Sequence, residues 1–564
     1  MFCCSTRRNW NPVSLVIDWF ARIDDATPPA KPCLPVTAEA MQDQVDVASV
    51  QSTQPEQTLA PPPLRVQGFS DEARAALLAC YQPHELSALE RQLATPNAAL
   101  HLRCNKLRSG RAALLEELRR QPELEGFRVE PHPTLGDVAV VPRKPCAPML
   151  APYLALDADP AMRGPQRFIE RKRLGLPPHE VFLDRVCAEA VLKGADVFVR
   201  GIRGASAGVD VGDSVTVYAD AHEPASLLRG AVCETLGPGI VLIGVGECRM
   251  DRPSLFREWK GLGVRMRHTV AGDLPSMSGV LDDRLYVQSL PSLTAAHVLG
   301  ARPGERVLDM CGAPGSKSSH IATNFLRDDV DAGSLLVSCE RNHGKLEKLR
   351  ALCEDTLGLR CVTPLRADST SLGHADARVP GLPYPQWRRS FDRVLLDPPC
   401  SALGLRPKLL QSATAATLTQ AFEFQRLFLW CAVRMLRVGG TLVYSTCTLT
   451  TDENEGMVAY ALRRYPCLQL QPAEPRVGAC GRPGASGLSE AQCAMVQRFE
   501  PSDGTEGFFI ARFLKTCEED DEHDGEGGRA DGGDAKPSPD SLKFTISVAK
   551  GPTLSARIEL LPVS

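Results

Sequence analysis

Hydrophobic positions in the second half of the chain alternate between short continuous runs and helical spacing. The short runs favour buried strands and occupy residues 306–310, 335–339, 363–365, 394–396 and 441–444. Helical periodicity falls between them, in residues 343–357, 415–436 and 453–464, and a late run at 508–513 adds a strand. This alternation predicts a doubly wound, Rossmann-like α/β domain with a mostly parallel sheet, over residues 263–516.

The first half of the chain predicts two further regions. A helical pattern from Ser70, strands at 101–105 and 137–142 and a basic helix near 108–120 indicate an N-terminal α/β region over 67–185. Proline and charge dominate 144–180, which we interpret as a loop insertion. Residues 186–262 carry short β-type runs punctuated by glycines, among them residues 201, 204, 208, 212, 237, 239, 244 and 246, a pattern typical of a small β-barrel.

The two ends of the chain differ from the rest. Residues 1–66 are rich in Pro, Gln, Thr and Ala, and we expect disorder there. Residues 517–564 form an acidic, mostly disordered tail, and nine acids against one base give residues 518–534 a net charge of −8. The whole chain of 564 residues has a net charge of −4, so the remainder carries −4 − (−8) = +4. A mildly basic body is compatible with RNA binding without requiring it.

Cysteine usage and hydropathy narrow the class of protein. None of the 20 cysteines forms a C-x-x-C pair, so the sequence predicts no metal site. We expect most of them to be small core residues of a protein in a reducing compartment. There is no run of about 18 apolar residues and no secretory signal, so we expect no membrane span. We expect a monomer in the cytoplasm, with a nuclear or organellar location left open.

A glycine-containing loop follows the first strand of the predicted sheet. It runs Cys311-Gly312-Ala313-Pro314-Gly315-Ser316-Lys317-Ser318. It is neither G-x-G-x-x-G nor G-x-x-x-x-G-K-[ST], so a dinucleotide fingerprint and a P-loop are excluded. Glycines here let the backbone approach a ligand closely.

Acids follow the next three strands at the same edge of the sheet. They are Glu340, placed for ribose hydroxyls, Asp368, placed for an adenine amine, and Asp397. One acid at a strand end is usually a helix cap, but three beside a glycine loop describe a nucleoside site. No phosphate is required there, and S-adenosylmethionine fits this site best.

Two cysteines, Cys400 and Cys447, end neighbouring strands at this edge. A thiolate that adds to C6 of a pyrimidine makes C5 nucleophilic enough to attack a methyl donor. Such a reaction needs one nucleophilic cysteine, an acid that stabilises the ring at N3 and a base for the C5 proton, and the second cysteine is placed for the release step. Asp397 is placed for the acid, but spacing alone does not say which cysteine attacks.

These segments resemble the motifs of the Sun-domain (NOL/NOP/Sun) RNA cytosine-C5 methyltransferases. The match covers residues 311–318, Asp397-Pro398-Pro399-Cys400, Gly404-Leu405-Arg406-Pro407, Phe424-Gln425-Arg426, Ser445-Thr446-Cys447-Thr448, Glu453-Asn454-Glu455, residues 467–472 and residues 507–510. The resemblance implies that Cys447 attacks the base and that Cys400 assists release. It also implies an S-adenosylmethionine cofactor held by residues 311–317, Glu340, Asp368 and Asp397.

The glycine-punctuated segment resembles a PUA domain, an RNA-binding pseudo-barrel, in residues 193–202 and 212–215. A PUA domain ahead of the catalytic domain marks the sixth member of the animal set of this family. The resemblance covers about 85–516, apart from 144–180. It implies a tRNA substrate methylated near the acceptor 3′ end, with the barrel holding the CCA end and some messenger RNA hairpins as secondary targets. Candidate RNA contacts are Lys317, Arg229, Arg103 and Arg406, together with the basic stretches 103–120 and 252–267.

The chain departs from the family pattern at several positions. The glycine loop usually reads Cys-Ala-Ala-Pro-Gly-Gly-Lys-Thr, whereas this chain has Gly312, Ser316 and Ser318, and Glu340 replaces an aspartate. We expect these changes to adjust cofactor affinity. Two alternatives stay open at this point. One is a catalytically silent tRNA-binding or assembly factor, and the other is a methyltransferase for an exocyclic amine or a protein side chain, which Cys400 after Asp-Pro-Pro disfavours.

Overall fold

The computed structural model describes residues 67–281, 283–373, 388–411, 413–484 and 487–519. The predicted disorder of residues 1–66 and most of the predicted acidic tail lie outside the described residues.

An eight-stranded sheet forms the centre of the predicted α/β domain. Its order is β14-β13-β12-β15-β17-β20-β18, and β19 also pairs with β20. The strands are β12 (Arg306–Asp309), β13 (Leu335–Glu340), β14 (Val362–Arg366), β15 (Phe391–Leu396), β17 (Leu436–Thr446), β18 (Leu468–Gln471), β19 (Gln497–Phe499) and β20 (Phe508–Lys515). The first five are parallel, and β20 runs antiparallel to its neighbours. The predicted Rossmann-like sheet is confirmed.

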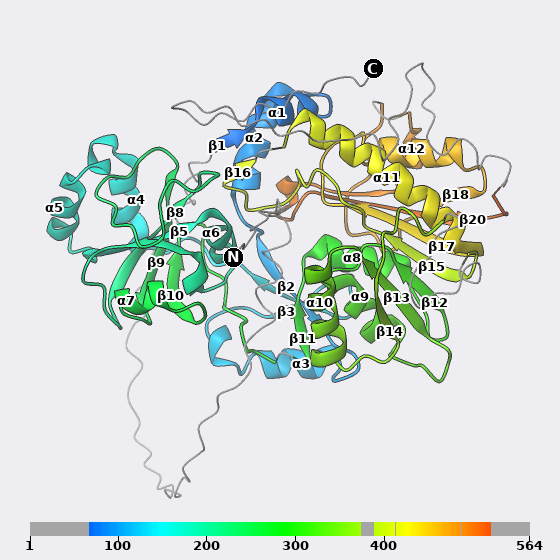
Figure 1. Cartoon of the computed structure of the whole chain (residues 1–564), viewed down its shortest axis with the longest axis horizontal. Helices are drawn as coiled ribbons and strands as arrows, with labels where there is room; N and C mark the ends of the chain where they lie inside the picture. Colours follow the sequence, from blue (N-terminus) through cyan, green and yellow to red (C-terminus); the bar gives the residue numbers. More distant parts are fainter. Residues whose placement is uncertain (1–66, 282, 374–387, 412, 485–486, 520–564) are drawn as a thin grey trace, which may run out of the picture. The chain divides into compact units, whose positions relative to one another are not determined.

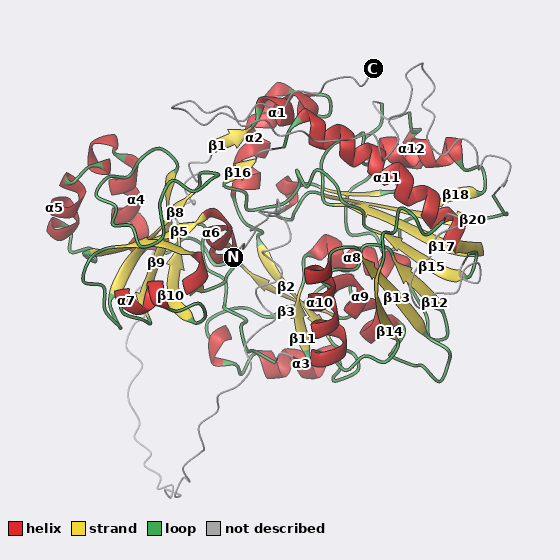
Figure 2. Ribbon diagram, in the orientation of Figure 1, coloured by secondary structure: helices red, strands yellow, loops and turns green. Residues whose placement is uncertain are grey.

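Helices cover both faces of this sheet (Figures 1 and 2). They are α8 (Leu290–Leu299), α9 (Ser316–His320), α10 (His343–Arg350), α11 (Ala415–Met435), α12 (Glu455–Arg464) and α13 (Glu490–Met495). Alternate strand residues enter different cores, because successive side chains point to opposite faces of a sheet. Leu308 and Val394 pack with α11 and α12, whereas their neighbours Val307 and Leu395 pack with α8 and α10. Burial on both faces explains why these strands read as continuous apolar runs.

The N-terminal region consists of a helix pair and a small sheet, both of which contact the α/β domain. Its elements are β1 (Gln67–Phe69), α1 (Asp71–Leu78), α2 (Pro83–Ala94), β2 (Ala99–Cys104), α3 (Arg111–Leu118), β3 (Glu130–Pro131) and β4 (Val138–Pro142). The small sheet has the order β11-β2-β4-β3, in which β11 (Leu285–Val287) comes from much later in the chain. Strand β1 pairs with β16 (Leu410–Gln411). These pairings attach the N-terminal region to the α/β domain at two places.

A six-stranded sheet of order β6-β10-β9-β8-β5-β7 occupies the position of the predicted barrel. Its elements are β5 (His179–Asp184), α6 (Arg185–Leu192), β6 (Val197–Phe198), β7 (Ile202–Ala205), β8 (Ser214–Asp220), β9 (Ile240–Cys248), α7 (Arg252–Arg257) and β10 (Leu262–Thr269). The two end strands, β6 and β7, are joined by the short turn Val199–Gly201, so the sheet curls back on itself. The sheet extends beyond the predicted limits of 186 and 262, because β5 begins at His179 and β10 ends at Thr269.

The predicted loop over 144–180 is wrong. This segment forms α4 (Ala151–Ala158) and α5 (Gln166–Arg173). Pro152 and Pro160 lie at helix starts, where a missing N–H costs nothing. Two of its charges are buried: Arg167 and Arg171 both pair with Glu180 of β5, at 2.9 and 2.8 Å. Proline and charge therefore mark a packed helical cover in this segment.

None of the described helices combines the length and the apolar character that crossing a membrane requires.

Candidate active site

The glycine loop turns directly from β12 into α9. Gly315 adopts φ +114°, a left-handed value that L-residues avoid, and caps the helix that starts at Ser316. A Cβ on Gly312 would lie 1.8 Å from Ser338 Oγ, so no larger residue fits beside this serine. The chain therefore has Gly312 where the family usually has alanine because Ser338 of β13 fills the space. Cys311, before these two glycines, and Ala313 and Pro314, between them, are half-buried.

Asp309 supports the loop from below. Its carboxylate accepts from Ser318 Oγ at 2.7 Å and from the backbone N–H of Cys311 at 3.3 Å. Burial raises the pKa of Asp309 to about 6, and the Ser318 hydrogen bond opposes this shift. The hydroxyl of Ser318 thus has a structural partner in this chain.

Arg103 holds the same loop from the N-terminal region. Its guanidinium, on β2, donates to the backbone oxygen of Ser316 at 2.7 Å and to Ser319 Oγ at 3.0 Å. The residue is only 2% exposed and also donates to Gln288 Oε1. Sequence reasoning placed Arg103 among the RNA contacts, but a buried guanidinium with these partners is not accessible to an RNA phosphate in this structure.

The predicted cofactor acids lie at the ends of adjacent strands. Glu340 ends β13, and its Oε1 accepts from the backbone N–H of Asn342 at 2.6 Å. Asp368 follows β14, and its two carboxylate oxygens accept from Thr370 Oγ1 at 2.6 Å and from Arg341 at 3.4 Å. Both side chains are half-buried at the edge that also carries the glycine loop. Two acceptors beside a loop without side chains at Gly312 and Gly315 fit an uncharged ribose and adenine better than a phosphate.

Asp397, after β15, is paired with Lys317 of the glycine loop. Lys317 Nζ lies 2.5 Å from Asp397 Oδ2, and Ser445 Oγ donates to Oδ1 at 3.1 Å. Burial disfavours the Lys317 ammonium, but the Asp397 charge outweighs burial and raises the pKa of Lys317. Lys317 therefore stays charged and orients the carboxylate. Sequence reasoning missed Ser445, although it stands two residues before Cys447.

The two predicted catalytic cysteines meet. Cys400 Sγ and Cys447 Sγ lie 3.4 Å apart. The hydrogen bond to Cys447, together with burial, raises the pKa of the Cys400 thiol well above its usual range. Cys400 is therefore a neutral thiol at physiological pH, able to donate its proton toward the Cys447 sulfur.

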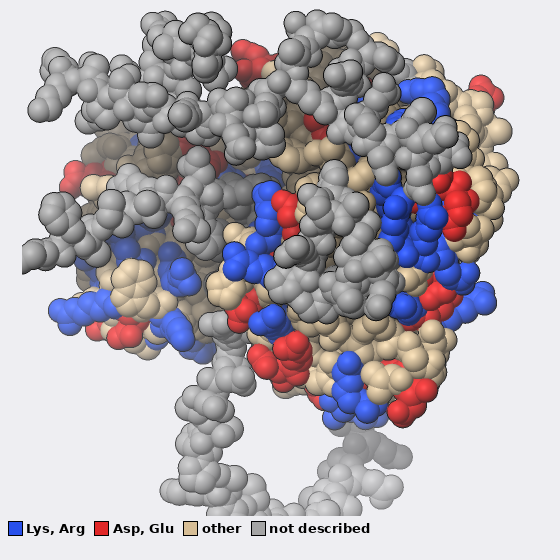
Figure 3. All heavy atoms as spheres, turned by 45° about the vertical axis from the view of Figure 1, so that its right-hand side comes forward, with Lys and Arg blue, Asp and Glu red and all other residues tan. Residues whose placement is uncertain are grey.

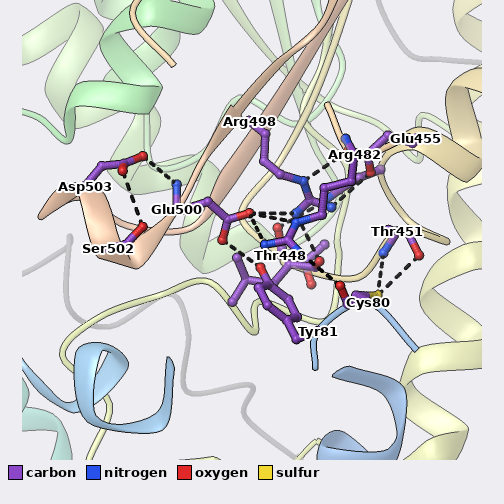
Figure 4. Close-up of polar contacts among 12 residues, drawn as sticks. Cys80, Tyr81, Thr448, Thr451, Glu455, Arg482, Arg498, Glu500, Ser502 and Asp503 are labelled. Carbon is purple, nitrogen blue, oxygen red and sulfur yellow. Dashed lines mark hydrogen bonds and ion pairs between the residues drawn. The ribbon is translucent and has the colours of Figure 1, made fainter. Parts of the chain in front are cut away.

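The loop after Cys447 is tied to the N-terminal helix pair (Figure 4). Arg498 of β19 forms a double hydrogen bond with Glu455, at 3.0 and 2.9 Å, and donates to the backbone oxygen of Leu449. In the turn between α1 and α2, Tyr81 donates to Glu500 at 2.7 Å. Cys80 Sγ in the same turn accepts from the backbone N–H of Thr451 at 3.2 Å. The helix pair is therefore part of the support of the catalytic loop, a role that its amphipathic pattern did not reveal.

The other two arginines predicted to bind RNA also have internal partners. Arg406 is 4% exposed and donates to the backbone oxygens of Thr95, Pro96, Pro501 and Thr505. This burial contradicts a phosphate contact by Arg406. Arg229 is half-buried, and it donates to Val199, Ile202 and Leu255 carbonyls. RNA contacts by Arg229 and Lys317 stay predictions.

One group of potential metal ligands occurs among the described residues, where the sequence predicted none. Asp137, His297 and His320 bring their ligand atoms within 4.8 Å of one another. His297 Nε2 and His320 Nε2 lie 2.7 and 3.0 Å from the Asp137 oxygens, which are ordinary hydrogen-bond distances. Asn324 also donates to this carboxylate at 2.6 Å. The group therefore reads as a buried hydrogen-bonded junction of the N-terminal sheet with α8 and α9.

Comparison with known proteins identifies this arrangement. Residues 296–514 match the family described as 16S rRNA methyltransferase RsmB/F. A mouse (Mus musculus) protein, tRNA (cytosine(72)-C(5))-methyltransferase NSUN6, is 36% identical over 72% of this chain and 84% of its own length. The tRNA (cytosine(72)-C(5))-methyltransferase of Pyrococcus horikoshii is 29% identical over 80% of this chain and 98% of its own.

A solved structure agrees with these sequence matches. The crystal structure of NSun6 from Pyrococcus horikoshii with SFG, an S-adenosylmethionine analogue, superposes with a TM-score of 0.61 and 28% identity. It covers 80% of this chain and 99% of that chain. The relatives do not favour the alternative of a catalytically silent RNA-binding factor. The chain therefore belongs to the RsmB/F (NOL/NOP/Sun) family of S-adenosylmethionine-dependent RNA cytosine-C5 methyltransferases.

Proposed function

We propose that this protein methylates C5 of a cytosine near the 3′ end of the tRNA acceptor stem, with Cys447 as the nucleophile. The observation that carries the proposal is the pair of sulfurs 3.4 Å apart, beside Asp397 and the glycine loop. The names of the mouse and archaeal relatives, which specify cytosine 72 of tRNA, support the substrate. The target base must leave its stack to reach a sulfur at the end of β17.

The residues divide the reaction between them. Cys447 Sγ forms a bond to C6, and the displaced electron pair moves to N3, which takes up a proton through Asp397, whose partner Lys317 carries one. N3 gives this proton back after C5 has attacked the methyl group. Bound S-adenosylmethionine supplies the methyl group that C5 attacks. After a base removes the C5 proton, the C5–C6 double bond re-forms and the electron pair of the C6–S bond returns to Cys447 Sγ. Lys317 holds Asp397 in place throughout, through its 2.5 Å contact.

Cys400 assists the last of these steps. Its pKa is raised by the hydrogen bond to Cys447 and by burial, so it presents a proton to the departing sulfur. A neutral thiol is a poor attacking group, which supports assigning the attack to Cys447. The neighbouring Asp309 has its own partners and takes no part in this exchange.

We infer that the six-stranded barrel is a PUA domain that holds the CCA end. The support is an exposed surface at α7 and the following turn, where Trp259 is 75% exposed and Arg257 and Lys260 flank it. Arg229 lies 5.9 Å from the centre of the Trp259 ring. Figure 3 shows Lys and Arg side chains gathered at the lower left, where the barrel is drawn. An exposed indole among cations can stack on an unpaired base while the cations contact phosphates.

Three finer assignments are also proposals. Free cysteines throughout the described residues support a reducing compartment, which we take to be the cytoplasm. We also propose that the protein acts as a monomer. Unpaired loops of messenger RNA hairpins offer the same flipped cytosine and are proposed as secondary substrates.

A binding and methylation experiment tests the substrate. We expect the full-length protein to methylate intact tRNA and to lose at least tenfold in kcat/KM when the CCA end is removed. Trp259→Ala with Lys260→Gln should raise KM for intact tRNA while leaving activity on trimmed tRNA unaltered. Equal methylation of trimmed and intact tRNA by the unaltered protein would exclude recognition of the 3′ end.

A further inference from the structure

The carboxylate of Glu453 is buried beside the two cysteines. It is 2% exposed and accepts hydrogen bonds from the backbone N–H of Ser401 at 3.0 Å, Gln425 Nε2 at 2.8 Å and Thr450 Oγ1 at 2.9 Å. The Ser401 hydroxyl donates to it as well. An ionised carboxylate only accepts, and here all four donors come from the protein. Burial of a carboxylate costs free energy unless hydrogen-bond donors surround it. Glu453 therefore holds its four donors in place.

These contacts hold the residues on both sides of Cys400 in the sequence. Ser401, which follows Cys400, gives Glu453 both its N–H and its hydroxyl. Gln425 of α11 donates to the backbone oxygen of Pro399, which precedes Cys400, at 3.2 Å. Tyr444 fixes Gln425 in turn, because its hydroxyl donates to Gln425 Oε1 at 3.0 Å. The loop over 399–401 is thereby attached to Glu453 at each neighbour of Cys400.

The Cys447 loop has its own support. Thr446 Oγ1 contacts Asn454, and Asn454 Nδ2 donates to the backbone oxygen of Thr448 at 3.1 Å. Thr446 is also the last residue of β17, which lies inside the sheet. Removal of the Glu453 carboxylate would therefore loosen the Cys400 loop, because Ser401 would keep only the 2.5 Å contact of its Oγ with Thr448 Oγ1 among these side-chain contacts. The Cys447 loop would lose the Thr450 contact, but Cys447 stays attached to β17 and Asn454.

We propose that Glu453 is a positioning residue for product release: its carboxylate holds the loop over 399–401 so that Cys400 Sγ stays against Cys447 Sγ. The inference rests on the proposed function, because it takes release as the role of Cys400. Glu453 acts through Ser401 and Gln425 and touches neither base nor cofactor. Its loss should therefore impair the same step as loss of Cys400.

The experiment compares Glu453→Ala with Cys400→Ala in the full-length protein. Each is incubated with tRNA and S-adenosylmethionine and run on a denaturing gel. We expect Glu453→Ala to accumulate a covalent RNA–protein adduct, with methyl transfer in the first turnover near the unaltered rate and multiple turnover reduced at least tenfold. Glu453→Gln should recover most turnover, because its amide oxygen can accept from the Ser401 and Gln425 N–H groups and its nitrogen can donate to the two hydroxyls.

The outcomes separate the two claims. If Cys400→Ala turns over without an adduct, the proposed role of Cys400 fails and the inference fails with it. If Cys400→Ala forms the adduct but Glu453→Ala turns over normally, or binds S-adenosylmethionine yet forms no adduct, only the inference fails. If Glu453→Ala does not fold, shown by loss of cofactor binding, Ser401→Ala decides. We expect partial adduct accumulation from Ser401→Ala, and unaltered turnover would overturn the inference.

Discussion

Cys400 and Cys447 are 47 positions apart in the sequence, yet their Sγ atoms lie 3.4 Å from each other. Two neighbouring parallel strands, β15 and β17, end at the same edge of the sheet and bring them there. The hydrogen bond to Cys447, together with burial, raises the pKa of the Cys400 thiol well above its usual range. A thiol that keeps its proton suits the proposed releasing role of Cys400 and leaves the proposed attack to Cys447.

Cys447→Ala should abolish methylation of RNA and leave S-adenosylmethionine affinity within about twofold. The proposed cofactor acids, Glu340 at the end of β13 and Asp368 after β14, lie away from β17, so we expect the change to leave them unaffected. Isothermal titration with the cofactor and a labelled-methyl assay measure both quantities on one preparation. Turnover by Cys447→Ala at the rate of the unaltered protein would show that Cys447 is not the nucleophile.

Cys400→Ala should form the S–C6 bond and transfer the methyl group but fail to release the RNA. A slower protein band that disappears on nuclease treatment would show this adduct. Cys400→Ala combined with Cys447→Ala is the matched control and should give no such band. A band that persists in the double variant would mean that another residue attacks.

Gly312→Ala should weaken cofactor binding at least tenfold, because its Cβ would meet Ser338 Oγ at 1.8 Å. Adding Ser338→Ala removes that oxygen and should restore part of the affinity. Recovery remains partial because Ser318 Oγ still lies 2.9 Å from the added Cβ. Unchanged affinity in Gly312→Ala alone would contradict the explanation for glycine at this position.

The buried Asp309 should make stability depend on pH. Burial raises the pKa of Asp309 from 3.8 to about 6, so the folded protein favours the neutral acid. The stability that the neutral acid contributes is fully present below pH 3.8 and is lost as pH rises to about 6. This shift corresponds to about 3 kcal/mol. Asp309→Asn has no carboxyl group to titrate at this position. Between pH 4 and 6 the free energy of unfolding of the unaltered protein should therefore fall relative to that of the variant. Parallel curves from urea unfolding at several pH values would rule this out.

Arg103 should stabilise the protein without binding RNA. Arg103→Met removes hydrogen bonds to the Ser316 carbonyl and Ser319, so we expect a loss of about 2–4 kcal/mol of stability and weaker cofactor binding. The salt dependence of tRNA binding should stay the same. Arg257→Gln, on the exposed barrel surface, should show the reverse: unaltered stability and a shallower salt slope. An equal change in slope for both variants would contradict the burial of Arg103.

The sheet could be predicted from the sequence because its strands are buried on both faces and leave uninterrupted apolar runs. The edge carrying Glu340, Asp368, Asp397 and the two cysteines followed from the same runs, since parallel strands end together. Local pattern was therefore enough to predict which of these residues lie at one edge of the sheet.

The errors share a cause, which is that burial of a charged side chain leaves no local signature. Arg103 and Arg406 looked like surface cations, and their internal carbonyl partners come from segments far away in the sequence. The segment over 144–180 looked like a loop because proline and charge dominate it, although two of its charges, Arg167 and Arg171, pair with Glu180 in the interior. Glu453 lay in a motif that the resemblance marked, but only the fold shows which loop its carboxylate holds.

The central claim is methylation of a tRNA cytosine through Cys447. The most direct measurement incubates the purified protein with labelled S-adenosylmethionine and total small RNA, then maps 5-methylcytosine by bisulfite sequencing. The account predicts one discrete site near the 3′ end of tRNA acceptor stems that is absent when Cys447→Ala replaces the unaltered protein. Methylation elsewhere, or at the same site with Cys447→Ala, would contradict it.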